Sequence, residues 1–127
     1  MQNTALTKST TANRNDNDLI IQSIQDKKGQ RIVSLDLRNI NESITDYFII
    51  CEADSTIQVK AIAENIVEKV HELTGVNPSH KEGFENLEWV LLDYFDTVVH
   101  VFHKTTREFY KLEELWSDVP TTEYESY

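Results

Sequence analysis

Four side chains near the middle of the chain could together carry metal chemistry. Asp93 and Asp96 lie on either side of a short break between two apolar runs, and His100 and His103 follow on the second run. Carboxylates and imidazoles are ligands that divalent metals accept. In an extended strand, however, side chains alternate between opposite faces, so two histidines three residues apart point away from each other. The spacing therefore disfavours a metal site built from these four residues.

A narrower metal hypothesis stays open as the alternative function. Asp93 and Asp96 could by themselves hold a magnesium ion in an enzyme related to nucleotidyltransferases, because metal-assisted phosphoryl transfer needs at least two converging carboxylates. Two other histidines, His71 and His80, stand alone in a helix end and a loop, and we expect both to be solvated.

The remaining candidates for catalysis or cofactor binding are isolated. Cys51 is the single cysteine, so it forms no internal disulfide, and its place in an apolar run predicts a buried thiol. The three glycines are scattered and supply no glycine-rich phosphate loop. The turn before the helix that begins near Ser55 offers backbone amides to an anion, but Glu52 and Asp54 in that turn would repel it. We therefore predict a protein that is not an enzyme and that binds no cofactor.

The charge balance points to a protein partner. The formal charge is −10, with 12 basic and 22 acidic residues, which disfavours direct binding to RNA or DNA. Residues 82–96 contain five acids and no lysine or arginine, interleaved with Phe84, Trp89, Tyr94 and Phe95. Aromatic side chains often anchor interfaces, and complementary charge favours a basic partner. Acidity alone also fits the simpler reading that it confers solubility.

The length and the composition predict one domain. Residues 1–15 are polar and read as a disordered leader, residues 16–117 as the folded domain, and residues 118–127 as an acidic tail. No apolar run approaches the roughly 20 residues that span a bilayer, and the first residues lack the apolar core of a secretion signal. We expect a cytosolic protein.

The residues considered first must be positioned by a hairpin. The runs 89–94 and 97–103 alternate in period two, which places Trp89, Leu91 and Asp93 on one face of a sheet, and the pair Phe95-Asp96 predicts a short turn. Such turns favour a positive φ, for which Phe95 is poorly suited. An aromatic side chain displayed at a turn tip is a candidate contact residue.

The flanking segments predict an α/β architecture with a mixed sheet. We expect a helix from residue 17 or 18 to 28, a half-exposed strand over 31–37 and a fully covered strand over 46–51. Ser55 and Gln58 form a capping box at the start of a helix that runs to about Leu73, and its buried stripe is Val59, Ile62, Ala63, Ile66, Val70 and Leu73. A helix of this length between strands predicts a parallel pair. Residues 76–87 read as a loop, and a last helix begins at 104–106.

Three motifs in order carry a family resemblance: TDYFIICEADSTIQVKAIAENIVEKV, WVLLDYFDTVVHVFH and REFYKLEELW. Together they resemble the ribosomal silencing factor family, also called Iojap-like, over about residues 17–117. The resemblance implies a mixed-sheet fold related to nucleotidyltransferases but without their activity. It also implies binding to the large ribosomal subunit through ribosomal protein number fourteen, which blocks joining of the small subunit and lowers translation.

The resemblance also nominates site residues. The family usually has glycine where this chain has Phe95, and Glu52-Ala53-Asp54 replaces a small, threonine-containing turn. Self-association through a sheet edge or the aromatic C-terminal motif, giving a homodimer, could coexist with ribosome binding. The expected partner-binding residues are Trp89, Leu91, Asp93, Tyr94, Phe95, Asp96, His100, Phe102, Arg107 and Tyr110.

Overall fold

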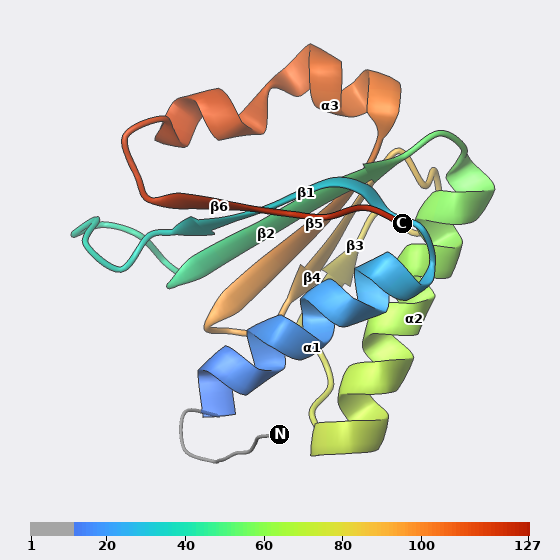
Figure 1. Ribbon diagram of the computed structural model, residues 1–127, viewed down its shortest axis with the longest axis horizontal. Coiled ribbons are helices and arrows are strands. Elements are labelled where there is room, and N and C mark those ends of the chain that lie inside the picture. The colour runs from blue at the N-terminus through green and yellow to red at the C-terminus, as the bar shows by residue number, and fades with distance from the viewer. Residues whose placement is uncertain (1–11) are drawn as a thin grey trace.

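The fold is a six-stranded mixed sheet with helices on both faces, which confirms the predicted α/β class with a mixed sheet and adds two strands to the four that the sequence predicts. The computed structural model describes residues 12–127, and Figure 1 shows the helices α1 and α2 on the opposite side of the sheet from α3. The strand order is β3-β4-β5-β2-β1-β6. The strands are β1 (Gln30–Asp36), β2 (Tyr47–Ala53), β3 (His80–Glu82), β4 (Trp89–Asp93), β5 (Thr97–His103) and β6 (Thr121–Tyr124).

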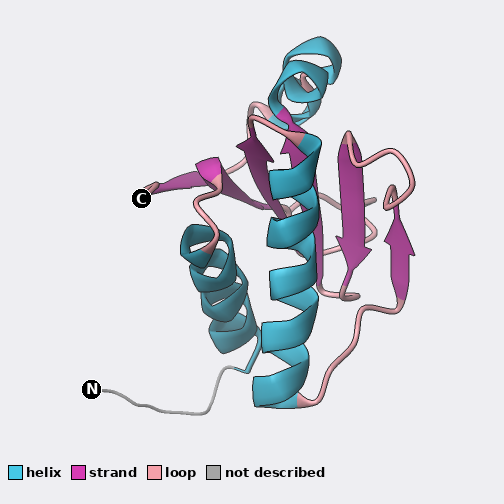
Figure 2. Ribbon diagram, turned by 90° about the vertical axis from the view of Figure 1, so that its right-hand side faces the viewer, coloured by secondary structure: helices cyan, strands magenta, loops and turns pink. Residues whose placement is uncertain are grey.

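Two long helices cover one face of the sheet. Figure 2 shows α1 (Ala12–Asp26) and α2 (Thr56–Thr74) packed beside each other against the strands. The core between them is almost entirely aliphatic, with Ile24, Ile49, Ile62, Ile66 and Val99 all fully buried. No helix within residues 12–127 is long and apolar enough to cross a lipid bilayer.

The other face carries α3 (Lys104–Tyr110) and the short 3-10 helix η1 (Leu112–Trp116). These elements cover a smaller core, in which Leu35, Ile50 and Phe102 pack with partly buried aromatic side chains. The end of this face near the β4–β5 turn lies beyond the reach of α3, which begins at the far end of β5. The second face is therefore only partly covered.

The centre of the sheet is a parallel pair, as predicted, but the partner of β2 is β5 and not β4, the strand that the sequence analysis placed next after the long helix. β2 pairs with β5 in parallel over all seven residues of each strand, from Tyr47 opposite Thr97 to Ala53 opposite His103. β4 pairs with β5 in the antiparallel hairpin that the sequence predicts. Because β2 is covered on both faces, five of its residues in a row are buried.

The caps of α2 follow the sequence closely. The Ser55 side chain accepts a hydrogen bond from the Gln58 backbone amide, and Gly75 ends the helix with φ +78°. The Gln58 side chain differs from the predicted reciprocal bond, because it donates to the carbonyls of Lys27 and Lys28 instead. The predicted stripe is buried except for Leu73, whose prediction was wrong because the last turn of α2 extends past the sheet.

Three other segments differ from the sequence expectations. Helix α1 already begins at Ala12, within the predicted leader, whose residues 1–11 lie outside the described part of the chain. The predicted loop 76–87 contains β3, and the predicted tail 118–127 contains β6, which pairs with β1. Both are short edge strands held by backbone hydrogen bonds, so their polar side chains give no alternating apolar signal.

Candidate functional site

The second face of the β4–β5 hairpin brings several nominated residues together. Trp89 lies opposite Phe102, Leu91 opposite His100 and Asp93 opposite Val98. Val90 and Leu92 point into the core on the face that α1 and α2 cover. The alternation predicted for both strands is therefore confirmed, and it places an unusual number of rings on one side.

These rings form one continuous cluster, which we call the aromatic face. Its members are Phe48, Trp89, His100, Phe102, Tyr110 and Trp116. The ring centroids of Trp89 lie 4.8 Å from Phe102 and 5.1 Å from Tyr110, and those of Phe48 lie 4.7 Å from His100. Such separations are those of favourable aromatic pairs, so the rings hold one another in place.

His100 fixes the orientation of Trp89. The Trp89 Nε1–H donates to His100 Nδ1 at 3.0 Å, so the imidazole proton belongs on Nε2. The Nε2 atom is buried and makes no hydrogen bond to any other described residue. Burial lowers the pKa of His100 to about 4, because the charged form would lose its hydration. His100 is therefore a neutral acceptor beneath the surface and does not itself face a partner.

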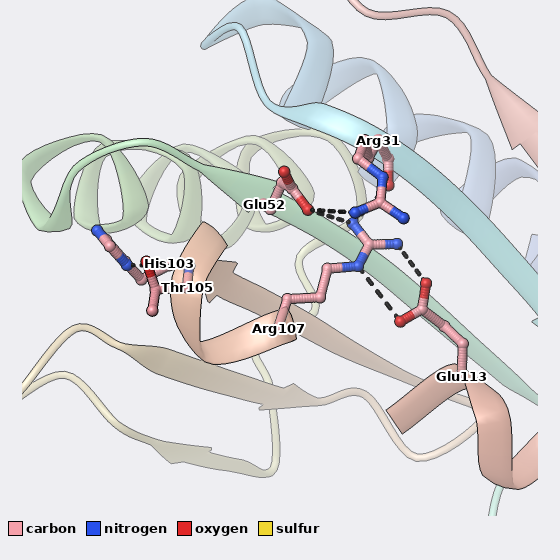
Figure 3. A network of polar contacts seen from close by, with 6 residues as sticks. All are labelled: Arg31, Glu52, His103, Thr105, Arg107 and Glu113. Carbon is pink, nitrogen blue, oxygen red and sulfur yellow. Dashed lines mark hydrogen bonds and ion pairs between the residues drawn. The ribbon is translucent and has the colours of Figure 1, made fainter. Parts of the chain in front are cut away.

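A buried ion network attaches α3 to the sheet (Figure 3). Arg107 and Glu52 both have side chains only 2% exposed, and Arg107 Nη1 lies 3.2 Å from Glu52 Oε1. The same nitrogen donates to the Arg31 carbonyl at 2.7 Å. Arg107 also donates through Nε and Nη2 to both carboxylate oxygens of Glu113, at 3.3 and 2.6 Å. The guanidinium group thus joins α3, η1, β1 and β2.

The surroundings of Arg107 are adapted to this network. Arg31 has φ +49° where the register between β1 and β2 shifts, and this irregularity turns its carbonyl toward Arg107. Burial opposes ionisation of Glu113, but the hydrogen bonds and charge of Arg107 outweigh it and lower the pKa of that carboxyl group. Arg107 was nominated as a partner contact, and its position makes it a support for Tyr110 on the same helix.

The ten nominated residues divide by location. Phe102, His100 and Arg107 are buried, whereas Trp89, Leu91 and Asp93 are partly exposed on the second face and Tyr110 is 55% exposed. Tyr94 and Asp96 lie on the other side of the sheet, beside α1, and Phe95 stands exposed at the turn. On the second face, the nominated residues that are at least partly exposed are therefore Trp89, Leu91, Asp93 and Tyr110.

The alternative magnesium site finds no support in the positions of its two carboxylates. Asp93 Oδ1 accepts the Phe95 backbone amide at 2.8 Å. Asp96 lines a cavity of about 30 Å³ together with Asp16 and Tyr94 on the α1 side. Burial, and then the charge of Asp96, raise the pKa of Asp16, and burial raises that of Tyr94 to about 12. Among residues 12–127, no three His, Cys, Asp or Glu side chains cluster as a metal site.

The other isolated candidates also have ordinary positions. Cys51 is buried, as predicted, and burial raises the pKa of its thiol to about 12, so it carries no nucleophilic thiolate. His71 and His80 are exposed, and His80 Nε2 lies 2.6 Å from Glu82 Oε2.

Sequence reasoning missed two residues of this site, Phe48 and Glu52. Phe48 was read only as part of a covered strand, although its alternation with Ile49 places it on the second face. Glu52 was read as an acid in the turn before the long helix, but it lies in β2 and is the buried partner of Arg107, 55 residues away in the sequence. Only a pairing between distant segments discloses such a contact.

The family profile and the sequence relatives that match this chain agree on one family. The sequence profile of the family described as "Ribosomal silencing factor during starvation" matches residues 10–127. The chain is 44% identical over 107 residues to "Ribosomal silencing factor RsfS" of Halalkalibacterium halodurans, covering 84% of this chain and 90% of that protein. A crystal structure of a Chromobacterium violaceum protein superimposes with a TM-score of 0.77 at 38% identity, covering 82% of this chain and 85% of the other.

A more distant relative carries the large ribosomal subunit in its name. The mouse protein named "Mitochondrial assembly of ribosomal large subunit protein 1" is 35% identical over 75 residues. The match covers 58% of this chain and 33% of the mouse protein.

Proposed function

We propose, from the premise that this chain belongs to the ribosomal silencing factor family, that it binds the large ribosomal subunit through ribosomal protein number fourteen. In this proposal the bound protein occupies the surface where the small subunit docks and so represses translation. The observation that carries the proposal is the partly exposed aromatic face, with Trp89 and Tyr110 in ring contact at 5.1 Å.

The composition of this surface supports a protein partner. Trp89, Leu91 and Tyr110 offer apolar contact area, and Phe109 extends it along α3 as a further exposed ring. Interfaces are enriched in such rings, and a few of them supply most of the binding energy. Because Trp89 and Tyr110 are already held by His100, Phe102 and α3, little conformational entropy is lost when they are covered.

The electrostatics and the family support the choice of partner. A net charge of −10 favours a basic protein over bare RNA, and ribosomal proteins are commonly basic because they bind RNA. The name of the mouse relative ties that protein to the large subunit. Blocking subunit joining by occupancy requires no catalytic group, so the proposal needs none from this chain.

Co-sedimentation with purified large subunits tests the proposal. We expect the wild type to bind and Tyr110→Ala and Trp89→Ala to bind more weakly, by on the order of 2 kcal/mol or about thirtyfold for the central tryptophan. Leu73→Ala is the control, since Leu73 is exposed on α2, on the other side of the sheet. Unfolding midpoints of all variants separate lost contacts from lost structure.

Two further measurements test the partner and the consequence. Purified ribosomal protein number fourteen should bind the chain directly, and wild type but not Tyr110→Ala should slow subunit joining followed by light scattering. The mass of the free protein across a dilution series shows whether it forms a homodimer. Normal binding by both aromatic variants would remove the aromatic face from the interface.

A further inference from the structure

Phe95 combines a strained backbone with an exposed ring. Its φ is +75°, a region that a bulky aromatic residue rarely adopts, and its side chain is 79% exposed. Phe95 belongs to neither buried core cluster of the described chain and pairs with none of its other rings. The strain is therefore not offset by packing of the ring within the domain, and strained positions of this kind concentrate at functional sites.

The turn around Phe95 is fixed by groups other than its ring. Asp93 Oδ1 accepts the Phe95 amide at 2.8 Å, and Thr45 Oγ1 donates to the Phe95 carbonyl at 3.0 Å. The Asp96 carbonyl accepts the amides of Asp46 and Tyr47, which ties the turn to the start of β2. These bonds fix the backbone that carries the exposed ring, and a fixed backbone lowers the conformational entropy lost on binding.

A second exposed apolar side chain belongs to the segment that is hydrogen-bonded to this turn. Ile44, 93% exposed, immediately precedes Thr45, whose hydroxyl contacts the Phe95 carbonyl. We call Phe95 and Ile44 the apolar rim. It stands at the end of the sheet where β2 and β5 begin, whereas α3 starts where β5 ends.

The two segments that form the apolar rim are acidic. Asp46, Asp93 and Asp96 lie in the two segments that form it, and residues 39–59 and 82–103 contain no lysine or arginine. Arg38, which precedes the first segment, is already paired with Asp36 at 2.7 Å. Phosphate groups would be repelled here, so a nucleic acid is the disfavoured occupant and a basic protein surface the favoured one.

We propose that the apolar rim is a second contact, which inserts Phe95 and Ile44 into an apolar depression on a basic protein of the large ribosomal subunit. This inference rests on the proposed function. Seven residues of β5 separate the rim from α3, or about 20 Å at a rise of roughly 3.3 Å per residue. Together the aromatic face and the rim span the width of an ordinary protein interface.

Replacing Phe95 by glycine separates binding from folding. Glycine adopts a positive φ without strain, so Phe95→Gly should leave the unfolding midpoint unchanged or raise it. The same variant should bind purified large subunits at least tenfold more weakly, whereas Phe95→Tyr, which keeps the ring, should bind like the wild type. Ile57→Ala is the matched control, because Ile57 is equally exposed but follows the opposite end of β2.

Photo-cross-linking identifies the occupant. With p-benzoylphenylalanine at position 95, we expect a cross-link to a ribosomal protein, and with the same group at position 57 we expect none. A cross-link to ribosomal RNA, or wild-type affinity in Phe95→Gly, would overturn the inference while leaving large-subunit binding intact. Failure of the wild type itself to bind large subunits would instead overturn the proposed function.

Discussion

Removing the guanidinium of Arg107 should destabilise the whole domain. The change Arg107→Met keeps most of the side-chain volume and deletes the ion pairs to Glu52 and Glu113 and the bond to the Arg31 carbonyl. Glu113 is partly exposed and can recover hydration, but Glu52 is only 2% exposed and cannot. The loss therefore comes chiefly from a buried carboxylate without its main partner.

The size of the effect follows from this burial. Breaking one side of a buried ion pair costs about 3–5 kcal/mol, because the remaining charge is left uncompensated. Arg31 Nη1 lies 3.3 Å from the same Glu52 oxygen, but its side chain is 61% exposed and compensates only in part. We expect a loss of about 3 kcal/mol, which for a domain of this size lowers the melting temperature by roughly 10 °C.

A double-mutant cycle measured by urea unfolding and far-ultraviolet circular dichroism tests the reasoning. Adding Glu52→Gln to Arg107→Met removes the orphaned charge and should recover most of the loss. Arg38→Met is the control, since Arg38 makes a comparable pair with Asp36 at the surface and should change the unfolding midpoint little. A loss below about 1 kcal/mol for Arg107→Met, or no recovery in the double variant, would refute a buried-charge origin.

Three other perturbations test separate parts of the structure. The pKa of His100 lies at about 4, below its ordinary value, so the neutral form stabilises the fold above about pH 6.5 and this contribution is lost as the pH falls toward 4. In the wild type, this effect should lower the free energy of unfolding by about 3 kcal/mol between pH 7 and pH 4, as measured by urea unfolding. His100→Gln should lack this decrease, whereas the decrease caused by other titrating groups should remain. At Gly83, with φ +92°, an added Cβ would lie 2.0 Å from the Trp89 carbonyl oxygen, whereas at Gly75, with φ +78°, it would meet nothing within 4 Å. Gly83→Ala should lower the melting temperature well beyond Gly75→Ala, which bears only a backbone cost of about 1 kcal/mol. Ser55→Ala removes the cap of α2 and should cost about 1 kcal/mol in urea unfolding.

The parts of the fold that the sequence predicts are those with a strong local period. The alternation along residues 89–103 correctly separates Trp89 and Leu91 from Val90 and Leu92, because each strand of the hairpin buries one face under the long helices. The start of α2 at Ser55 follows from local capping chemistry in the same way. Both are decided within a few residues, so a sequence contains them directly.

The parts that escape prediction depend on register between distant segments. Whether Phe48 meets His100 is set by the pairing of β2 with β5, and whether Glu52 is buried is set by the placement of Arg107 on α3. The edge strands β3 and β6 pair through their backbones, so their polar side chains conceal them. The exposed or buried state of each nominated site residue is likewise a tertiary property, which is why the ten candidates divide between exposed and buried positions.

Two of the buried candidates, His100 and Arg107, are polar groups that lie beneath an apolar surface. A hydrophobic substitute for His100 or Arg107 could fill the space, but it could not direct the Trp89 indole or place α3 over the sheet. Directional bonds select one arrangement of the rings, whereas apolar packing alone tolerates several. A surface that must fit one partner gains affinity from such preorganisation, because ordering is completed during folding and not during binding. The strained turn at Phe95 follows the same logic at the other end of the sheet, where side-chain hydrogen bonds from Thr45 and to Asp93 fix the backbone beneath an exposed ring.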